Sequence, residues 1–419
     1  MDKIRIKGGN ELKGEVRVSA AKNSVLPIIA ASILSSGEVI INNLPLLEDV
    51  FVICKVLDSL GCDVNIDYKS NKLKINSQNM KPINASSDLM KKMRASFLIM
   101  GPMLSKYGKC KIFLPGGCNI GSRPIDLHLK GFKGLGVNYN VGHGYVEATT
   151  KGLIGDLVYL DFPSVGATEN IIMASVLAKG TTIIENAAEE PEIEDLANFL
   201  NSMGAKIHGA GYGKITIEGV DELKGTSYTP IGDRIEAGTY MIAATLTNSK
   251  IKVIGVSENY LRPVIEKLKE SGVIFEIDDK QKTILVNGKI NKKPMNIKTM
   301  PYPGFPTDMQ AQMMALATVT KGVSIITETV FENRFMHAAE LVRMGANIKI
   351  DQRTALVDGV DKITGCEVRA TDLRAGAAMI LAGLVAEGET EVSDIYHIDR
   401  GYVNIERKLQ GLGACIERF

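Results

Sequence analysis

The pattern of hydrophobic and polar positions along the chain repeats six times. Each repeat starts with a glycine or serine and a short β-branched strand, continues through a turn and an amphipathic helix, and returns in a strand after another glycine. These closing glycines are Gly61, Gly136, Gly204, Gly272, Gly345 and Gly413, spaced 68 to 75 positions apart. A glycine in that place fits the C-terminal cap of a helix. Because the period exceeds that of common solenoids, each repeat is predicted to be a compact α/β unit with a β-hairpin.

A second set of helices, one ahead of each repeat, is apolar almost all the way round. The segments are 23–34, 93–100, 166–177, 237–245, 308–317 and 373–382. They are rich in Ala, Gly and Met, and small residues allow neighbouring helices to approach closely. A helix without a polar face is buried on all sides. The pattern therefore predicts buried helices that are enclosed by sheets.

Polar side chains concentrate at the N-terminal ends of these apolar helices. They are Lys22, Asn23, Arg94, Ser164, Thr168, Arg234, Glu236, Asp308, Asp372 and Arg374. Helix N-termini carry free N–H groups and the positive end of the helix dipole, so they attract anions. If the helices run parallel in two groups of three, these ends converge on one cleft. The alternative is ordinary capping, and Asp308, which follows Pro306 and Thr307, could serve only as a cap.

One stretch, residues 114–128, places a cysteine in a glycine-rich turn ahead of a helix pattern. Gly116 and Gly117 permit backbone angles that direct several N–H groups into one space. With Arg123 five positions further on, such a loop would favour the thiolate of Cys118 and could also hold an anion. The alternative interpretation is a surface turn with an inert thiol.

Composition narrows the class of protein. At 419 residues the chain is too long for one ordinary core, so two or more domains are expected. Apolar content of 45% and charged content of 23% are typical of a soluble globular protein, and the net charge of +1 implies no general attraction to nucleic acid or membranes. The sequence predicts neither a secretory signal nor a membrane span. Its six cysteines lack the spacing of zinc or redox sites, so we expect a reduced, cytoplasmic compartment and no metal.

Eight segments along the chain resemble one bacterial enzyme family, and together they extend over essentially the whole sequence. They are 19–23 (SAAKN), 92–96 (KMRAS), 114–128 (LPGGCNIGSRPIDLH), 164–168 (SVGAT), 305–312 (FPTDMQAQ), 327–337 (TETVFENRFMH), 370–374 (ATDLR) and 397–402 (HIDRGY). On these motifs the chain resembles the UDP-N-acetylglucosamine 1-carboxyvinyltransferases, which are enolpyruvyl transferases.

The resemblance implies a particular α/β fold. This fold is the inside-out α/β barrel, with two domains that each contain three βαβαββ-type repeats, sheets outside and buried helices inside. The first domain would span 22–229 and carry the Cys118 loop. The second domain would combine 1–21 with 230–419.

The resemblance also implies a reaction. The family transfers the enolpyruvyl group of phosphoenolpyruvate to the 3′-hydroxyl of UDP-N-acetylglucosamine and releases phosphate, the first committed step of peptidoglycan biosynthesis. Addition followed by elimination needs an acid for the methylene carbon and a base for the hydroxyl. It also needs cations for a phosphate and a carboxylate, and exclusion of water. Both substrates are small molecules, no cofactor or metal is implied, and the oligomeric state stays open.

The matching motifs assign roles to residues of this chain. Cys118 corresponds to the general acid, which also forms a covalent adduct with phosphoenolpyruvate, and an electrophilic phosphonate epoxide is expected to alkylate it. Asp308 corresponds to the base near the 3′-hydroxyl. The cations for phosphoenolpyruvate correspond to Lys22, Arg123 and Arg400, with Arg334 and Arg374 expected nearby, and Lys22 and Arg400 are expected to take part in catalysis. The contacts to the UDP-sugar correspond to Asn23, Arg94, Arg123, Pro124, Ile125, Asp126, Leu127, Ser164, Val165 and Val330, and Asp372 is grouped with them as a polar helix start.

The chain departs from the family pattern at two places, and two alternative functions are considered. Many members carry a lysine where this chain has Glu48, which reverses a charge expected near the nucleotide's diphosphate. Phe162 and Pro163 stand where some members have another lysine. One alternative is a non-catalytic paralogue that binds the UDP-sugar and regulates or scaffolds. Another is the sister transferase that acts on shikimate 3-phosphate, whose members lack the cysteine loop found here.

Overall fold

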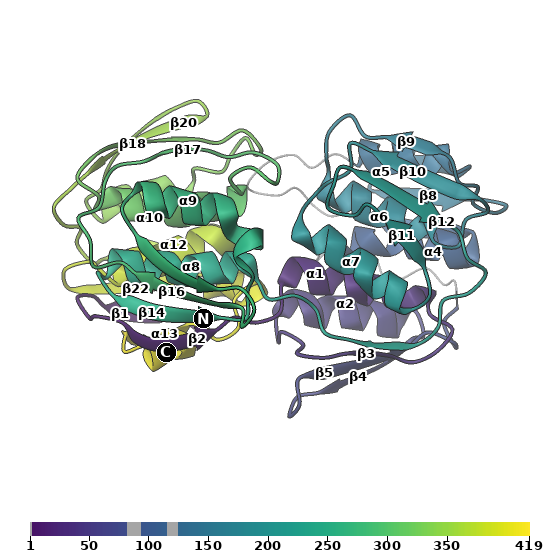
Figure 1. Ribbon diagram of the computed structural model, residues 1–419, viewed down its shortest axis with the longest axis horizontal. Helices are drawn as coiled ribbons and strands as arrows, with labels where there is room; N and C mark the ends of the chain where they lie inside the picture. Colours follow the sequence, from purple (N-terminus) through teal and green to yellow (C-terminus); the bar gives the residue numbers. More distant parts are fainter. Residues whose placement is uncertain (1, 82–93, 115–124) are drawn as a thin grey trace. The chain divides into compact units, whose positions relative to one another are not determined.

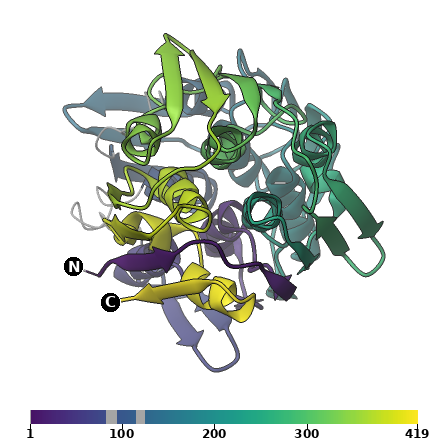
Figure 2. The ribbon, with the colours of Figure 1, turned by 90° about the vertical axis from the view of Figure 1, so that its left-hand side faces the viewer.

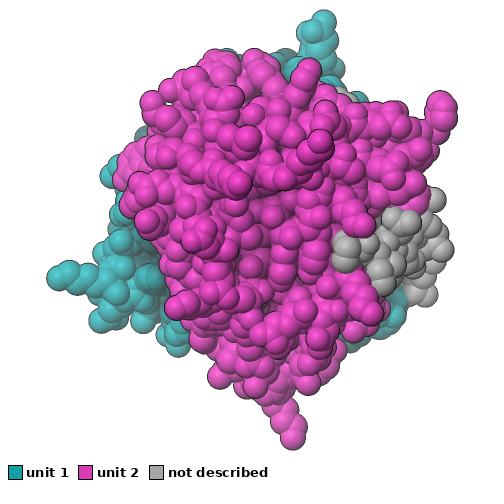
Figure 3. Space-filling model, turned by 90° about the vertical axis from the view of Figure 1, so that its right-hand side faces the viewer, with its two compact units in different colours: residues 1–19, 118–122, 232–419 teal, residues 20–117, 123–231 magenta. Residues whose placement is uncertain are grey.

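The computed structural model describes residues 2–81, 94–114 and 125–419, except for the side chains of residues 94–96. Its contacts divide the chain into two compact units, which are coloured separately in Figure 3. Unit 1 contains residues 1–19 and 232–419, and the described part of residues 20–231 forms unit 2. The N-terminal segment therefore belongs with the C-terminal half of the chain.

The element order that the periodicity predicted recurs along the chain (Figure 1). An apolar helix leads to a strand, an amphipathic helix follows, and further strands complete the repeat. The apolar helices are α1 (Lys22–Ala31), α4 (Met100–Tyr107), α6 (Val165–Ser175), α8 (Arg234–Leu246), α10 (Gln310–Thr318) and α12 (Leu373–Gly383). The amphipathic helices are α2 (Glu48–Ser59), α5 (Asp126–Gly134), α7 (Pro191–Ser202), α9 (Arg262–Glu270), α11 (His337–Arg343) and α13 (Ile405–Gly411). The short 3₁₀ helices are η1 (Ser32–Leu34), η2 (Arg94–Ile99), η3 (Glu258–Leu261), η4 (Thr307–Met309) and η5 (Ile395–Arg400).

The strands of the described residues form three sheets in each unit. In unit 1 the strand orders are β21 (Glu367–Arg369), β22 (Glu389–Ser393), β1 (Ile4–Lys7), β23 (Cys415–Arg418); β15 (Ile274–Asp278), β16 (Thr283–Asn287), β14 (Lys250–Ile254), β2 (Lys13–Arg17); and β17 (Asn296–Lys298), β18 (Gly322–Thr327), β20 (Thr354–Gly359), β19 (Asn347–Asp351). In unit 2 they are β11 (Lys206–His208), β12 (Lys214–Glu218), β10 (Thr181–Glu185), β9 (Leu157–Tyr159); β13 (Thr226–Tyr228), β3 (Val39–Ile41), β5 (Lys72–Asn76), β4 (Asp63–Asp67); and β6 (Lys109–Phe113), β8 (Tyr145–Thr149), β7 (Asn138–Gly142).

The first two strands of the chain complete sheets of the C-terminal half. β1 lies between β22 and β23 and is antiparallel to both, with Ile4 opposite Val392 on one side and Arg418 on the other. β2 adds an edge strand parallel to β14, with Val16 opposite Val253. These pairings are the physical reason that the N-terminal segment belongs to unit 1.

The apolar helices of unit 1 are buried over nearly their whole length because they have no polar face. Every residue of α8 and α10 is buried, and in α12 only Leu373 is partly exposed. Figure 2, with unit 1 toward the viewer, shows strands at the periphery and helices inside. Strand side chains such as Ile251, Val253 and Ile326 contribute to the same core. The predicted burial of these helices is confirmed.

The six closing glycines lie where the helix caps were predicted. Each follows an amphipathic helix and precedes a strand, and their φ angles lie between 86° and 107°. An L side chain disfavours that backbone conformation, whereas glycine adopts it freely. The predicted C-terminal caps are confirmed.

One segment that the pattern predicted as a single helix is divided. The 3₁₀ helix η2 comes first, and the α-helix α4 starts only at Met100. Pro102, in the first turn of α4, has no N–H to donate to the carbonyl of Leu98, so one bond of the α-helical ladder is missing at this junction. Asp308 likewise lies in η4, ahead of α10, and not within the α-helix itself.

Candidate active site

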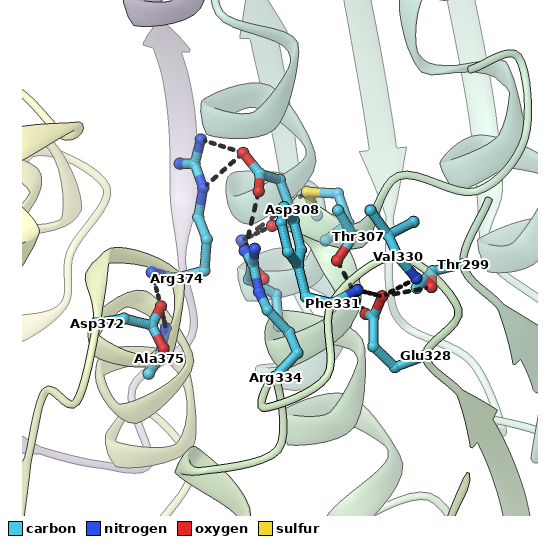
Figure 4. Close-up of polar contacts among 12 residues, drawn as sticks. Thr299, Thr307, Asp308, Glu328, Val330, Phe331, Arg334, Asp372, Arg374 and Ala375 are labelled. Carbon is cyan, nitrogen blue, oxygen red and sulfur yellow. Dashed lines mark hydrogen bonds and ion pairs between the residues drawn. The ribbon is translucent and has the colours of Figure 1, made fainter. Parts of the chain in front are cut away.

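The carboxylate of Asp308 is the centre of a charged cluster in unit 1. Arg334 reaches it from the turn between β18 and α11, and Arg374 from the first turn of α12. Arg334 Nη2 donates to Asp308 Oδ1 at 2.9 Å (Figure 4). Arg374 donates to Asp308 Oδ2 twice, from Nη2 at 2.9 Å and from Nε at 3.2 Å. The fold thus brings together three predicted site residues that lie far apart in sequence.

Burial and neighbouring charges shift the pKa values of Asp308 and Arg374 in opposite directions. The side chains of Arg334 and Arg374 are 3% and 4% exposed, and that of Asp308 is 28% exposed. Burial disfavours the ionised form of Asp308, but the charges and hydrogen bonds of Arg374 and Arg334 outweigh burial and hold the pKa of the carboxyl well below its usual range. At Arg374 burial favours the neutral form, but the Asp308 charge prevails and raises the pKa of the guanidinium. A carboxylate held in this way is a weak base for as long as both arginines bind it.

The start of α12 holds Arg374 in place. Asp372 caps this helix, because its Oδ1 accepts from the backbone N–H of Arg374 at 2.8 Å and of Ala375 at 3.1 Å. The guanidinium carbon of Arg374 lies 5.4 Å from the centre of the Tyr402 ring. Arg374 Nη1 is buried and has no hydrogen-bond partner within the described residues. A buried guanidinium with a free donor is suited to an anionic ligand.

A neutral network lies behind Asp308. Gln312 Nε2 donates to the backbone carbonyl of Asp308 at 2.9 Å and to the Tyr402 hydroxyl at 3.3 Å. Thr239 Oγ1 lies 2.9 Å from the same hydroxyl. Burial raises the pKa of Tyr402, so its phenol stays protonated and polar without charge. Sequence reasoning did not single out these residues, although polar side chains inside otherwise apolar helices are a signal that could have found Gln312 and Thr239.

Glu328 is a second carboxylate of this region that sequence reasoning missed. It follows β18 and is 1% exposed. Its oxygens accept hydrogen bonds from two hydroxyls and from two backbone N–H groups, one of which belongs to Val330 (Figure 4). The N–H of Val330, a predicted substrate contact, is therefore already used within the protein. An acid directly after a strand that alternates between buried and exposed positions was the available signal.

In unit 2 the predicted cation Lys22 begins α1 and has a carboxylate partner. Its Nζ lies 2.7 Å from Oδ2 of Asp49, in the first turn of α2, and the two side chains are 12% and 8% exposed. The neighbouring Glu48, which departs from the family pattern, is exposed and lies in the same first turn. The ion pair therefore fixes the lysine through Asp49, a residue that the sequence did not identify. Asn23, the next predicted site residue, is exposed.

Three other predicted segments of unit 2 are linked through Asn170 of α6. Asn170 Oδ1 accepts from the backbone N–H of Gly101 in α4 at 2.8 Å, and Nδ2 donates to the carbonyl of Phe97 in η2 at 3.1 Å. Nδ2 also lies 3.0 Å from Nδ1 of His128 in α5. A Cβ on Gly101 would come within 2.4 Å of the Asn170 carbonyl oxygen, so only glycine allows this approach. Asn170 thereby connects η2, which begins at Arg94, to α5 and α6.

The other predicted residues of unit 2 lie at helix starts. Ser164 is the N-cap of α6, and its Oγ accepts from the N–H of Ala167 at 3.4 Å. Val165 begins α6, and Ile125, Asp126 and Leu127 stand at the start of α5. These helix starts are the places where free N–H groups favour anions.

Of the remaining predicted site residues, most lie outside the described residues, and Arg400 lies in unit 1. Cys118, Arg123 and Pro124 lie outside the described residues, as does the side chain of Arg94. In unit 1, Arg400 ends η5 and is half-buried. Burial and then the Arg400 charge lower the pKa of the adjacent His397. Arg400 therefore places a positive charge beside His397 at this end of η5.

Two kinds of feature, a membrane-spanning helix and a metal-binding cluster, are absent from the described residues. No helix there is long and apolar enough to cross a membrane. No group of three or more His, Cys, Asp or Glu side chains in the same residues is arranged to hold a metal ion.

Comparison with known proteins places the chain in a family. A family model described as EPSP synthase (3-phosphoshikimate 1-carboxyvinyltransferase) matches residues 6–409. Relatives from Clostridium acetobutylicum and Clostridium perfringens, each named UDP-N-acetylglucosamine 1-carboxyvinyltransferase 1, are 64% identical over 418 and 421 residues, with 100% of both chains covered. The chain belongs to the enolpyruvyl transferase family.

Solved structures of enolpyruvyl transferases share the fold. The enolpyruvyl transferase NikO from Streptomyces tendae matches with a TM-score of 0.89 at 25% identity, covering 100% of this chain and 98% of that chain. EPSP synthase from Acinetobacter baumannii matches with a TM-score of 0.75 at 18% identity over 100% of both chains, which is a likeness of fold alone. The resemblance recognised from the sequence motifs and the predicted α/β class are both confirmed.

Proposed function

We propose that this protein transfers the enolpyruvyl group of phosphoenolpyruvate to the 3′-hydroxyl of UDP-N-acetylglucosamine and releases phosphate. The observation that carries the proposal is 64% identity, over the whole length of both chains, to relatives named UDP-N-acetylglucosamine 1-carboxyvinyltransferase. The reaction begins peptidoglycan biosynthesis, uses two small-molecule substrates and requires no cofactor. A cytoplasmic location fits the five cysteines of the described residues, all of which are free thiols.

The reaction requires an acid and a base that act on different atoms. The sugar hydroxyl gives its proton to the base as its oxygen bonds to C2 of phosphoenolpyruvate, and C3 takes a proton from the acid. Loss of a proton from C3 and departure of phosphate then restore the double bond. We assign the acid to Cys118 and the base to Asp308.

In this proposal, the ion pairs of Asp308 with Arg334 and Arg374 control how basic its carboxylate is. While Arg334 and Arg374 bind Asp308, its low pKa makes it a poor proton acceptor. A substrate phosphate or carboxylate that engages Arg374 would weaken the hold of that arginine on Asp308 and restore part of its basicity. Lys22, Arg123 and Arg400 would supply further positive charge to the same substrate.

The UDP-sugar would contact the helix starts and one turn. Its proposed contacts are Asn23, Arg94, Arg123, Pro124, Ile125, Asp126, Leu127, Ser164, Val165, Val330 and Asp372. Free N–H groups at helix starts suit the charged diphosphate. In this proposal the architecture is the inside-out α/β barrel, with one domain of residues 22–229 and a second of 1–21 and 230–419.

Two other functions have weaker support. The sister reaction on shikimate 3-phosphate is the one named in the family model, but the EPSP synthase structure is only 18% identical to this chain. A non-catalytic UDP-sugar-binding paralogue rests on Glu48 alone. That side chain is exposed, and its charge removes none of the groups proposed for the chemistry.

Turnover by the pure protein tests the proposal. The protein is incubated with phosphoenolpyruvate and UDP-N-acetylglucosamine, and released phosphate and enolpyruvyl-sugar are measured in parallel. We expect equal amounts of both, and no phosphate when shikimate 3-phosphate replaces the UDP-sugar. Absence of turnover with the UDP-sugar would reject the proposal, and turnover with shikimate 3-phosphate would assign the sister reaction.

A further inference from the structure

We propose that Glu328 is a positioning residue that fixes Asp308 and Val330 relative to each other for the transfer reaction. The proposal rests on the proposed function of the protein. Glu328 stands directly after β18, and its side chain is almost completely buried. Its two carboxylate oxygens bind η4, the turn that follows β18, and Thr299 after β17, as Figure 4 shows.

The first oxygen binds the segment that carries Asp308. Glu328 Oε2 accepts a hydrogen bond from Thr307 Oγ1 at 2.8 Å. Thr307 is the first residue of η4, directly before Asp308. This bond therefore sets the backbone position from which the Asp308 carboxylate projects.

The second oxygen binds the turn that follows β18. Glu328 Oε1 accepts from the backbone N–H of Val330 at 2.8 Å and of Phe331 at 3.1 Å. It also accepts from Thr299 Oγ1 at 2.8 Å. The same turn continues to Arg334, whose Nη2 binds Asp308. Glu328 thus anchors both segments that meet in the Asp308–Arg334 ion pair.

The cost of burying this carboxylate supports a geometric role. Its four donors are uncharged, so the desolvation of Glu328 is offset only by complete hydrogen bonding. A shorter Asn or Ser cap would satisfy the two turn N–H groups with less buried charge. Such a cap would not reach Thr307. The longer glutamate side chain therefore does what the turn alone does not require, which is to join the turn to η4.

Three variants test separately the bond of Glu328 to η4 and its bonds to the turn that follows β18. Glu328→Ala removes both, and we expect kcat to fall and the KM for UDP-N-acetylglucosamine to rise, each by about 10-fold or more. Thr307→Val removes only the bond to η4, so kcat should fall by about 10-fold while that KM changes by less than about 2-fold. Glu328→Gln keeps an acceptor for the Oε1 donors and a donor for the Thr307 hydroxyl, so it should recover most of both losses.

Matched controls and a second measurement complete the test. Thr318→Val and Ser324→Ala each remove a buried hydroxyl of unit 1 that does not contact Glu328, and both should leave kcat and KM unchanged. Hydrogen exchange at the Val330 and Phe331 amides should accelerate in Glu328→Ala but not in Thr307→Val.

The outcomes distinguish the proposal from the function on which it rests. If wild-type protein shows no turnover, the proposed function fails, and hydrogen exchange alone decides whether Glu328 orders the turn. If Glu328→Ala merely lowers the active fraction at constant KM, with unchanged amide exchange, Glu328 is not a positioning residue. The same conclusion follows if Glu328→Gln is as impaired as Glu328→Ala.

Discussion

Asp308 in unit 1 and Asp195 in unit 2 are both carboxylates that accept three side-chain or backbone hydrogen bonds. Asp195 lies in α7 and is 2% exposed. Its donors are the Ser24 hydroxyl, the Tyr228 hydroxyl at 2.6 Å and the N–H of Ile231 at 3.2 Å. Burial raises the pKa of Asp195 despite these bonds, whereas the pKa of Asp308 is lowered.

The difference lies in the charge of the donors and not in their number. Neutral donors offset only part of the desolvation of Asp195, but two guanidinium groups more than offset that of Asp308. The two aspartates therefore have different roles. Asp195 ties α1, through Ser24, to the segment that ends unit 2 at Ile231, so it anchors the backbone near Lys22. Asp308 is held ionised by Arg334 and Arg374, for which an anionic substrate would compete in the proposed function.

The largest expected difference in the free energy of unfolding and in kcat is between Asp308→Asn and Asp195→Asn. Asp308→Asn leaves two buried arginines without a carboxylate, which should lower the free energy of unfolding by about 3–5 kcal/mol. Loss of the proposed base should also lower kcat by about 10²- to 10⁴-fold. Asp195→Asn is the matched control and should cost about 1 kcal/mol, because an amide oxygen still accepts from neutral donors. Urea unfolding and steady-state kinetics measure both, and equal effects of the two variants would contradict the comparison.

Asp49→Asn tests whether the Lys22–Asp49 pair, in which the carboxylate meets one cation, ranks between these cases. The substitution leaves Lys22, which is 12% exposed, without its carboxylate, and we expect a loss of about 1–3 kcal/mol in the free energy of unfolding. Because Lys22 loses its anchor, the KM for phosphoenolpyruvate should also rise. A loss as large as that of Asp308→Asn would show that the number of paired cations is not the deciding factor.

The pH dependence of stability should differ between the two aspartates. The raised pKa of Asp195 means that the folded protein takes up a proton where the unfolded chain, with a carboxyl pKa of about 3.9, is still ionised. Wild-type protein should therefore gain stability relative to Asp195→Asn as the pH falls from neutrality towards about 4. Asp308 has a lowered pKa, so its stabilisation should be lost only as the pH falls below about 4. Urea unfolding across this pH range would contradict the assignment if wild type and Asp195→Asn gave parallel curves.

The smallest expected effect belongs to Glu48, which is exposed in the first turn of α2. Glu48→Lys replaces an acid that the helix dipole favours, so it should cost about 0.5 kcal/mol of unfolding free energy. If the position faces the nucleotide's diphosphate, the KM for UDP-N-acetylglucosamine should fall by about 2- to 3-fold at low salt. The effect should vanish at high salt because an exposed charge is screened. An unchanged KM at both ionic strengths would exclude a role for this position in nucleotide binding.

Prediction from sequence succeeded where the signal lies within one element. The burial of α8, α10 and α12 followed from their apolar composition, and the closing glycines followed from their place after a helix. It failed where one residue interrupts a pattern, as Pro102 does by delaying the start of α4. It also missed Glu328 and Asp195, since an acidic residue in a sequence does not reveal that its donors come from distant segments.

The sequence by itself determined the repeated order of elements, the buried helices, the glycine caps of the amphipathic helices and the family of the chain. These properties follow from periodicity, from local backbone preference and from motifs, all of which are carried by contiguous residues. Only the tertiary structure decided that Asp308 meets Arg334 and Arg374, that Lys22 meets Asp49, and that Glu328 joins two segments. The physical reason is that ionisation and hydrogen bonding depend on burial and on neighbours contributed by other elements, so they come into being only when the chain folds.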